Sequence, residues 1–132
     1  MKKVFYTLVF SIIMYNIIFA QTVSVKQEKK QFLYLLRLEK SMRDTTAWTA
    51  EKQQVVAEHF ARLQKMLNDG YLILAGKTST DLKTTFGIVI YEADSIKEAE
   101  EIAGNDPAVK AGIMSVEVFP FKTALIKEGK IE

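Results

Sequence analysis

The chain has 132 residues, of which 48% are hydrophobic and 26% are charged, and it contains no cysteine and a single histidine. This size and balance are typical of one globular domain with one hydrophobic core. The missing cysteine excludes disulfides, cysteine zinc sites and a thiol nucleophile, and the single histidine excludes multi-histidine metal sites.

The first 20 residues have the layout of a secretory signal peptide. Lys2 and Lys3 precede an apolar run, residues 4–19, and the small Ala20 stands where cleavage is expected. The alternative is a retained membrane anchor, but an apolar helix of this length reaches roughly 24 Å, short of a hydrocarbon core of about 30 Å. We therefore expect an exported bacterial protein, periplasmic or secreted, with no stable membrane span after cleavage.

The chain that remains after cleavage is electrically balanced. The whole sequence has 18 basic and 16 acidic residues, and residues 1–20 contain two of the lysines and no acid. The mature protein therefore has equal numbers of both, and it lacks a basic stripe with interleaved aromatic residues. Proteins that bind nucleic acid usually show such a stripe, so we expect no nucleic-acid partner.

Two segments open the mature chain. Residues 21–30 are polar and charged, which predicts a flexible lead-in. Residues 32–38 are almost all apolar, at odd-numbered as well as even-numbered positions, which predicts a strand that is covered on both faces. A polar connection, residues 39–48, follows.

A long helix is expected next. Thr49 can cap its start and Gly70 can stop it, so the helix should run to about residue 69. With about 100° between successive residues, His59 lies on the inward flank of an apolar face. Four side chains form this expected core stripe: Val56, Phe60, Leu63 and Leu67.

A hairpin and a second helix follow. Residues 71–76 and 86–92 are apolar segments joined by a polar loop, so we expect them to pair as two strands. Ser95 and Glu98 have the spacing of a capping box, which predicts that a helix begins at Ser95 and ends at Gly104.

A single helical turn, a last strand and a tail complete the chain. The turn is expected between the Asp106–Pro107 pair and Gly112. Residues 113–119 alternate between apolar and polar side chains, as in a strand with one buried face. Pro120 is expected to end this strand, and the chain beyond it is a tail whose last part, residues 126–132, lies outside the domain.

This β-α-β-β-α-β order predicts a ferredoxin-like α+β domain, with a four-stranded antiparallel sheet and both helices on one face. The other face of the sheet carries several apolar residues and therefore needs cover. A second copy of the chain, packed sheet to sheet, is the simplest cover, so we expect a homodimer.

His59 and Asp106 are the two candidates for chemistry. An imidazole on the flank of a core stripe is either a buried histidine satisfied by a neighbouring acceptor or a general acid or base in a pocket. Asp106 precedes a proline, so its carboxylate is suited to cap the helical turn. The two roles are compatible, because a capping carboxylate can also accept a hydrogen bond from an imidazole.

Other polar and aromatic residues carry weaker signals. Ser115 and Glu117 share one face of the last strand, where Glu117 is either paired across the dimer or solvated at the rim. Arg37 is a possible partner for it. Tyr34 and Tyr71 are candidates for lining a pocket, although aromatic residues in strands usually belong to the core.

The common enzyme templates are missing from the sequence. It has no G-x-S-x-G elbow, no phosphate-binding P-loop and no G-x-G-x-x-G motif. With one histidine and no cysteine we expect no metal and no other cofactor. A haem site would need His59 as its axial ligand, and no other residue supports it.

Several ordered segments resemble the YCII-related (YciI-like) family of the dimeric α/β-barrel superfamily, over about residues 31–125. The resemblance rests on E-H-F-A-R-L (58–63), D-G-Y-L-I-L-A-G (69–76), S-I-K-E-A-E-E-I-A (95–103), N-D-P-A-V-K-A-G (105–112) and V-F-P-F-K (118–122). It implies a ferredoxin-like subunit, a dimer, and an active-site pair formed by His59 and Asp106. Two residues depart from the family pattern. Lys77 stands where proline is usual, at the expected pocket mouth. Ala108 stands where a large aromatic residue is common, which is expected to leave that pocket more open.

The leading hypothesis is an exported enzyme that moves protons on a small lactone- or carbonyl-type substrate. His59 would act as the acid/base, and Asp106 would orient it. The alternative is a non-catalytic small-ligand-binding or interaction module in which both residues are structural. A third possibility, an oxygen-using monooxygenase of the kind found on similar barrels, has no further residue in its favour.

Overall fold

The computed structural model describes residues 29–126, so the expected signal peptide and most of the expected lead-in and tail lie outside the described residues. The strands and helices follow in the order β1 (Lys30–Leu38), α2 (Ala50–Asn68), β2 (Leu72–Lys77), β3 (Phe86–Ala93), α3 (Ile96–Gly104), α4 (Pro107–Lys110) and β4 (Met114–Phe121). Two short 3₁₀ turns, Lys40–Met42 and Thr45–Ala47, connect β1 to α2. This is the predicted ferredoxin-like α+β order, in which α4 is the expected single turn.

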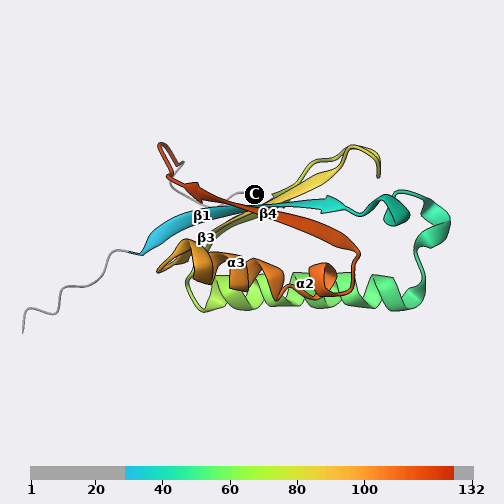
Figure 1. The fold of residues 1–132 in the computed structure, drawn as a ribbon, viewed down its shortest axis with the longest axis horizontal. Coiled ribbons are helices and arrows are strands. Elements are labelled where there is room, and N and C mark those ends of the chain that lie inside the picture. Colours follow the sequence, from blue (N-terminus) through green and yellow to red (C-terminus); the bar gives the residue numbers. More distant parts are fainter. Residues whose placement is uncertain (1–28, 127–132) are drawn as a thin grey trace, which may run out of the picture.

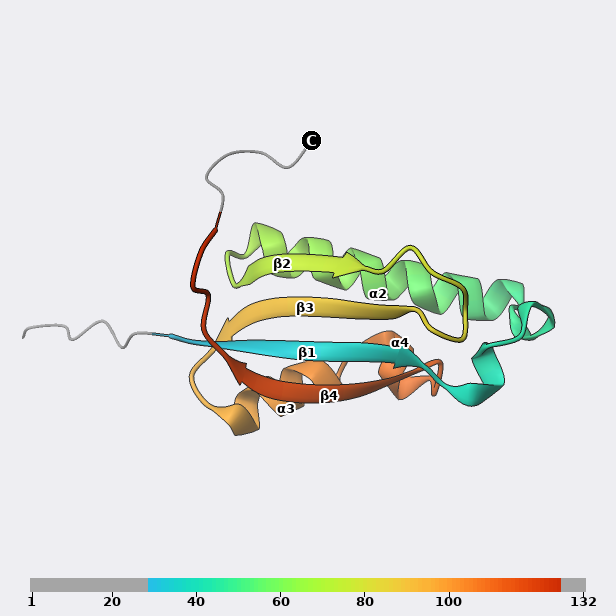
Figure 2. The same cartoon turned by 90° about the horizontal axis from the view of Figure 1, so that it is seen from above.

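The four strands form one antiparallel sheet in the order β2-β3-β1-β4. All helices lie on one face of this sheet (Figure 1). Figure 2 shows α2 behind β2 and β3, and α3 and α4 behind β1 and β4. The structure therefore has two layers. None of the helices among residues 29–126 is both long enough and apolar enough to cross a membrane.

The central strand β1 is buried on one side only. Its even-numbered residues, from Phe32 to Leu38, are buried against the helices, whereas Leu33 and Leu35 are half-buried and Arg37 is exposed. The prediction of a strand covered on both faces is therefore wrong for the single chain. Side chains that are paired across the strands line the uncovered side, which we call the open face: Leu33, Leu35, Arg37, Phe86, Ile88, Ile90, Glu117 and Phe119.

The helix α2 begins and ends as predicted, but it is rotated about its axis. The Thr49 hydroxyl accepts a hydrogen bond from the Lys52 amide, and Gly70 has a φ of +86° at the other end. Phe60 and Leu67 are 60% and 56% exposed, so they do not belong to the core stripe. The buried face contains His59, Leu63 and Met66, of which only Leu63 belongs to the predicted stripe. The rotation places the imidazole of His59 on the buried side of the helix.

The strand β4 continues through its proline. It runs to Phe121, and Pro120 is paired with Phe32 of β1. The prediction that Pro120 ends the strand is therefore wrong. β4 is an edge strand, and proline is tolerated there because the position without an N–H can point away from the sheet.

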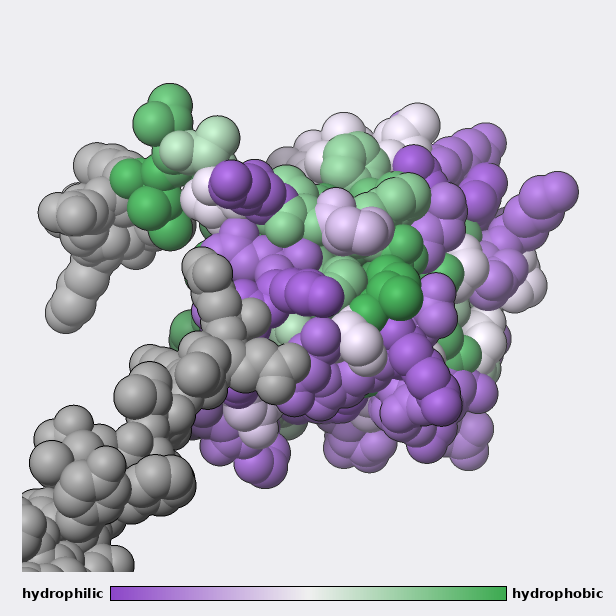
Figure 3. All heavy atoms as spheres, turned by 60° about the vertical axis from the view of Figure 1, so that its left-hand side comes forward, coloured by the Kyte–Doolittle hydropathy of each residue, from purple (hydrophilic) through white to green (hydrophobic). Residues whose placement is uncertain are grey.

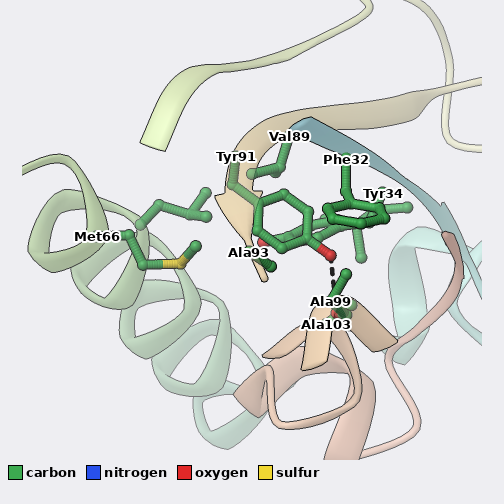
Figure 4. Packing of buried hydrophobic residues seen from close by; sticks show 10 residues of the cluster. Phe32, Tyr34, Met66, Val89, Tyr91, Ala93, Ala99 and Ala103 are labelled. Atoms are coloured by element: carbon green, nitrogen blue, oxygen red, sulfur yellow. Dashed lines mark hydrogen bonds between the residues drawn. The ribbon is translucent and has the colours of Figure 1, made fainter. Parts of the chain in front are cut away.

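The core lies between the sheet and the helices (Figure 4). The Tyr34 and Tyr91 rings meet edge to face, with 5.2 Å between their centroids. The Tyr91 hydroxyl donates a 2.7 Å hydrogen bond to the carbonyl of Ala99. Ala99 and Ala103 are fully buried, and their small side chains allow α3 to lie close to the tyrosine layer.

Candidate active site

His59 and Asp106, which are 47 residues apart in the sequence, are in direct contact. His59 Nδ1 lies 2.7 Å from Asp106 Oδ2. The Asp106 side chain is fully buried and His59 is only 9% exposed. The ion pair or hydrogen bond is therefore shielded from water. Electrostatic interactions are stronger in such a buried place than at the surface.

The backbone explains why Asp106 is held in this position. It is the N-cap of α4, and its Oδ1 accepts a 2.9 Å hydrogen bond from the Ala108 amide, with Pro107 as the first helical residue. Such capping fixes the side-chain torsions. The second oxygen, Oδ2, is thereby directed at His59. The predicted cap and the predicted imidazole partner are thus two oxygens of one carboxylate.

The contact also determines which ring nitrogen of His59 is available. An ionised carboxylate can only accept hydrogen bonds, so the hydrogen of a neutral His59 ring is on Nδ1. The other nitrogen, Nε2, then carries a lone pair. This arrangement is the one that a general base requires.

A third polar residue, Arg62, approaches the same carboxylate. Its Nη1 lies 3.8 Å from Asp106 Oδ2, and its Nη2 donates a 2.7 Å hydrogen bond to the carbonyl of Ile102. Sequence reasoning missed this residue. The signal was its spacing of three positions from His59, which places both side chains on the same face of a helix.

Tyr34 lies beside Asp106 but in the core. It is fully buried, and burial first, then the negative charge of Asp106, raise the pKa of its hydroxyl far above the usual value. This hydroxyl has no hydrogen-bond partner among the described residues. Tyr71 is half-buried and its hydroxyl donates to Asp69. Neither tyrosine lines the cavity described next.

A cavity of about 620 Å³ lies between α2, the sheet and the loop that precedes β3. His59 is in its wall, and most of the other lining side chains are apolar, including Trp48, Phe60 and Leu63. The size and the apolar lining with few polar groups are those of a small-molecule site. The Trp48 indole donates a 3.1 Å hydrogen bond to the carbonyl of Met42, which fixes the ring in the cavity wall.

The two departures from the family pattern have different positions. Lys77, at the end of β2, lines the cavity, in agreement with the predicted pocket mouth. Ala108 is fully buried in a separate cluster with Leu38, Met42 and Ile113, and it does not line the cavity. Its small size therefore does not open the pocket.

The remaining candidates lie on the open face; Arg37 also lines the cavity that contains His59, whereas Ser115 and Glu117 do not. The Arg37 guanidinium lies over the Phe86 ring, 5.5 Å from its centroid, and the Ser115 hydroxyl is 3.5 Å from the carbonyl oxygen of Arg37. Glu117 is exposed, and it makes no ion pair within residues 29–126. The same part of the chain contains no group of three or more side chains suited to hold a metal ion.

Comparisons with known proteins agree with this geometry at the level of the fold. The solved structure of a 5-chloro-2-hydroxyhydroquinone dehydrochlorinase from Burkholderia phenoliruptrix AC1100, in complex with 2,5-dihydroxybenzoquinone, aligns with a TM-score of 0.53 and 24% identity. The alignment covers 70% of this chain and 93% of the dehydrochlorinase chain. A comparison with curated protein sequences returned no match.

The family pattern of the YCII-related domain matches residues 26–122. This range includes all the strands and helices described above, as well as His59, Arg62 and Asp106. The chain therefore belongs to the YCII-related family.

Proposed function

We propose that this protein is a small enzyme that moves a proton on a small organic substrate, with His59 as the acid/base and Asp106 as the residue that orients it. The observation that carries the proposal is the 2.7 Å contact between His59 Nδ1 and the fully buried Asp106 carboxylate. Because His59 also lines an apolar cavity, the imidazole and a space for a substrate occur at the same place.

The chemistry follows from the hydrogen-bond arrangement. With its hydrogen on Nδ1, His59 can take a proton at Nε2 from a carbon next to a carbonyl group. The imidazolium that forms is stabilised by the Asp106 carboxylate. The electron pair of the broken C–H bond moves into the carbonyl to form an enolate, or expels a leaving group, and His59 then returns or releases the proton. Acid/base steps of this kind contribute typically 10²–10⁴-fold to a rate.

The solved dehydrochlorinase supports a substrate of this class. Its name describes the removal of hydrogen chloride, and its structure contains a small oxygenated ring compound. A cavity of about 620 Å³ with mostly apolar walls has room for a ring of that size. We propose a lactone- or carbonyl-type ring as the substrate.

We further propose that two copies pack through their open faces and that the protein is exported. The open face offers half-buried Leu33, Leu35 and Ile88 and exposed Phe119. In the C-terminal segment Leu125 is 95% exposed, and Figure 3 shows a separate group of hydrophobic residues standing clear of the body of the molecule. Large apolar residues that stay exposed in this way mark an interaction site. Export rests on the character of residues 1–20 alone.

The alternative function, a binding module without catalysis, has one observation in its favour. The cavity wall is mostly apolar, so it can hold a ligand with little help from His59. In that case His59 and Asp106 only stabilise the fold.

The experiment that separates the two functions is proton exchange in D₂O. A panel of small lactones and cyclic ketones is incubated with the mature protein, and loss of the α-proton signal is followed by NMR. We expect catalysed exchange with at least one compound, and a loss of about 100-fold or more in His59→Gln. Gln54→Ala, which changes an exposed polar residue of the same helix outside the cavity wall, is the matched control and should keep most of the rate. Undiminished exchange in His59→Gln would refute the proposal.

A further inference from the structure

The carboxylate of Asp106 has a second charged neighbour besides His59. Oδ1 is used by the Ala108 amide, and Oδ2 faces both His59 Nδ1 and Arg62 Nη1, at 2.7 Å and 3.8 Å. The Asp106 side chain is fully buried, whereas Arg62 is 25% exposed. A buried carboxylate without a compensating positive charge is strongly disfavoured, so one of these two neighbours must supply that charge.

The two possible sources of the charge have opposite consequences for the reaction. If His59 supplies it, the resting ring is an imidazolium, and Nε2 has no lone pair with which to take a proton. If Arg62 supplies it, His59 stays neutral. A guanidinium is permanently protonated in proteins, which makes Arg62 the stable source.

The position of Arg62 is fixed by a second contact. Its Nη2 donates to the carbonyl of Ile102 in the last turn of α3, and its Nη1 is buried with no hydrogen-bond partner among the described residues. The side chain thus joins α2 to α3 and brings an unused N–H group to the Asp106 side. We propose that Arg62 is the fixed counter-charge of Asp106 and thereby keeps His59 neutral, with its hydrogen on Nδ1 and its Nε2 lone pair available. This role rests on the proposed function, and it makes Arg62 a positioning residue.

The other titratable groups around the pair do not supply a charge. Burial is the main cause that raises the hydroxyl pKa of Tyr34 in β1 and of Tyr91 in β3 above the usual value. Both hydroxyl groups therefore stay uncharged. The Tyr91 hydroxyl is also occupied by the Ala99 carbonyl. Among the described residues, the ion pairs of Asp106 are those with His59 and Arg62.

A purely structural role for Arg62 is the alternative. In that case the Ile102 contact alone explains the residue, because basic side chains often bind the last carbonyl groups of a helix. Arg43 offers a matched control, since its Nε donates a 3.2 Å hydrogen bond to the carbonyl of Leu38 and it makes no ion pair with Asp106.

The test reads the protonation of the ring directly. The sequence contains one histidine, so ¹⁵N-labelled histidine gives the two nitrogen signals of a single imidazole. At pH 7 we expect one protonated nitrogen and one bare nitrogen in the wild type, in Arg62→Lys and in Arg43→Gln. In Arg62→Gln we expect both nitrogens to be protonated. A neutral ring in Arg62→Gln, indistinguishable from that of the wild type, overturns the proposal.

A second measurement covers the case in which Arg62→Gln does not fold. Arg62→Gln is introduced into Asp106→Asn, where no buried charge remains to be compensated, and the folding equilibrium is measured in urea. If Arg62 is a counter-charge, this substitution should lower the folding constant at least tenfold less in Asp106→Asn than in the wild type. Equal losses in the two backgrounds refute the counter-charge. Neither readout needs turnover, so missing catalysis in the exchange assay refutes the proposed function and leaves the assignment of Arg62 standing.

Discussion

The two sides of the sheet follow different physical rules. On the helix side, the polar groups are few, buried and mutually oriented: one carboxylate of Asp106 serves a helix cap and His59 at 2.7 Å. On the open face, the polar groups Arg37 and Glu117 are exposed and form no ion pair with each other, and the apolar residues between them are half-buried. The helices of the same chain cover one side of the sheet, whereas the other side is suited to be covered by a second chain.

The first prediction concerns the loss of the buried Asp106 carboxylate, which distinguishes the helix side of the sheet. Asp106→Ala deletes a helix cap and leaves a buried imidazole without a partner, so we expect a loss of roughly 2–5 kcal/mol in the free energy of unfolding. Urea unfolding measures it. Asp44→Ala is the control, because Asp44 caps the exposed turn Thr45–Ala47, and its loss should be clearly smaller. Equal losses in the two variants would contradict the account of a buried, shared carboxylate.

The second prediction tests the rotation of α2. Leu63 is 6% exposed and Leu67 is 56% exposed. Leu63→Ala should cost about 2–4 kcal/mol of unfolding free energy because it creates a cavity, and Leu67→Ala should cost about 0.5 kcal/mol or less. Comparable effects in the same urea experiment would mean that the helix presents the stripe expected from the sequence.

The third prediction concerns the open face. Leu35→Lys places a charge at the centre of the apolar surface that we propose to be the dimer interface, so the variant should sediment as a monomer at concentrations where the wild type is a dimer. Leu67→Lys adds the same charge to the exposed side of α2 and should leave the assembly unchanged. A wild-type protein that is monomeric in sedimentation would remove the proposed dimer altogether.

The smallest expected effect is the difference in unfolding free energy between substitutions of two buried tyrosines. Tyr91→Phe removes a 2.7 Å hydrogen bond to the Ala99 carbonyl and should cost about 1–2 kcal/mol of unfolding free energy. Tyr34→Phe removes a hydroxyl that has no partner among the described residues, so its cost should be near zero. The reverse ranking would show that Tyr34 makes a hydrogen bond to Asp106 after all.

Local patterns in the sequence predicted most of the fold, because caps and stops act over a few residues. Thr49 and Ser95 cap their helices as expected. The failures have non-local causes. Pro120 does not end β4, since its place at the sheet edge depends on the strand order. The hydropathy pattern wrongly placed Phe60 and Leu67 on the buried face of α2. Such a pattern does not include the contact of His59 with a buried carboxylate 47 residues away.

The candidate site was predictable in part. His59 and Asp106 were both identified from the sequence, with the help of the resemblance to the YCII-related family, and they are in contact in the structure. Arg62 and the partnerless hydroxyl of Tyr34 were not, since both matter only through their proximity to Asp106. A charge on a helix and a tyrosine in a strand carry no such information before the chain is folded.

The central claim is that Asp106 fixes the hydrogen of His59 on Nδ1 and leaves Nε2 free for chemistry. Two-bond ¹H–¹⁵N correlation spectra of the wild-type protein at neutral pH test this most directly, because the sequence has a single histidine. The account predicts a neutral ring with its hydrogen on Nδ1 alone. A ring with its hydrogen on Nε2, or a rapid mixture of both tautomers, would contradict it.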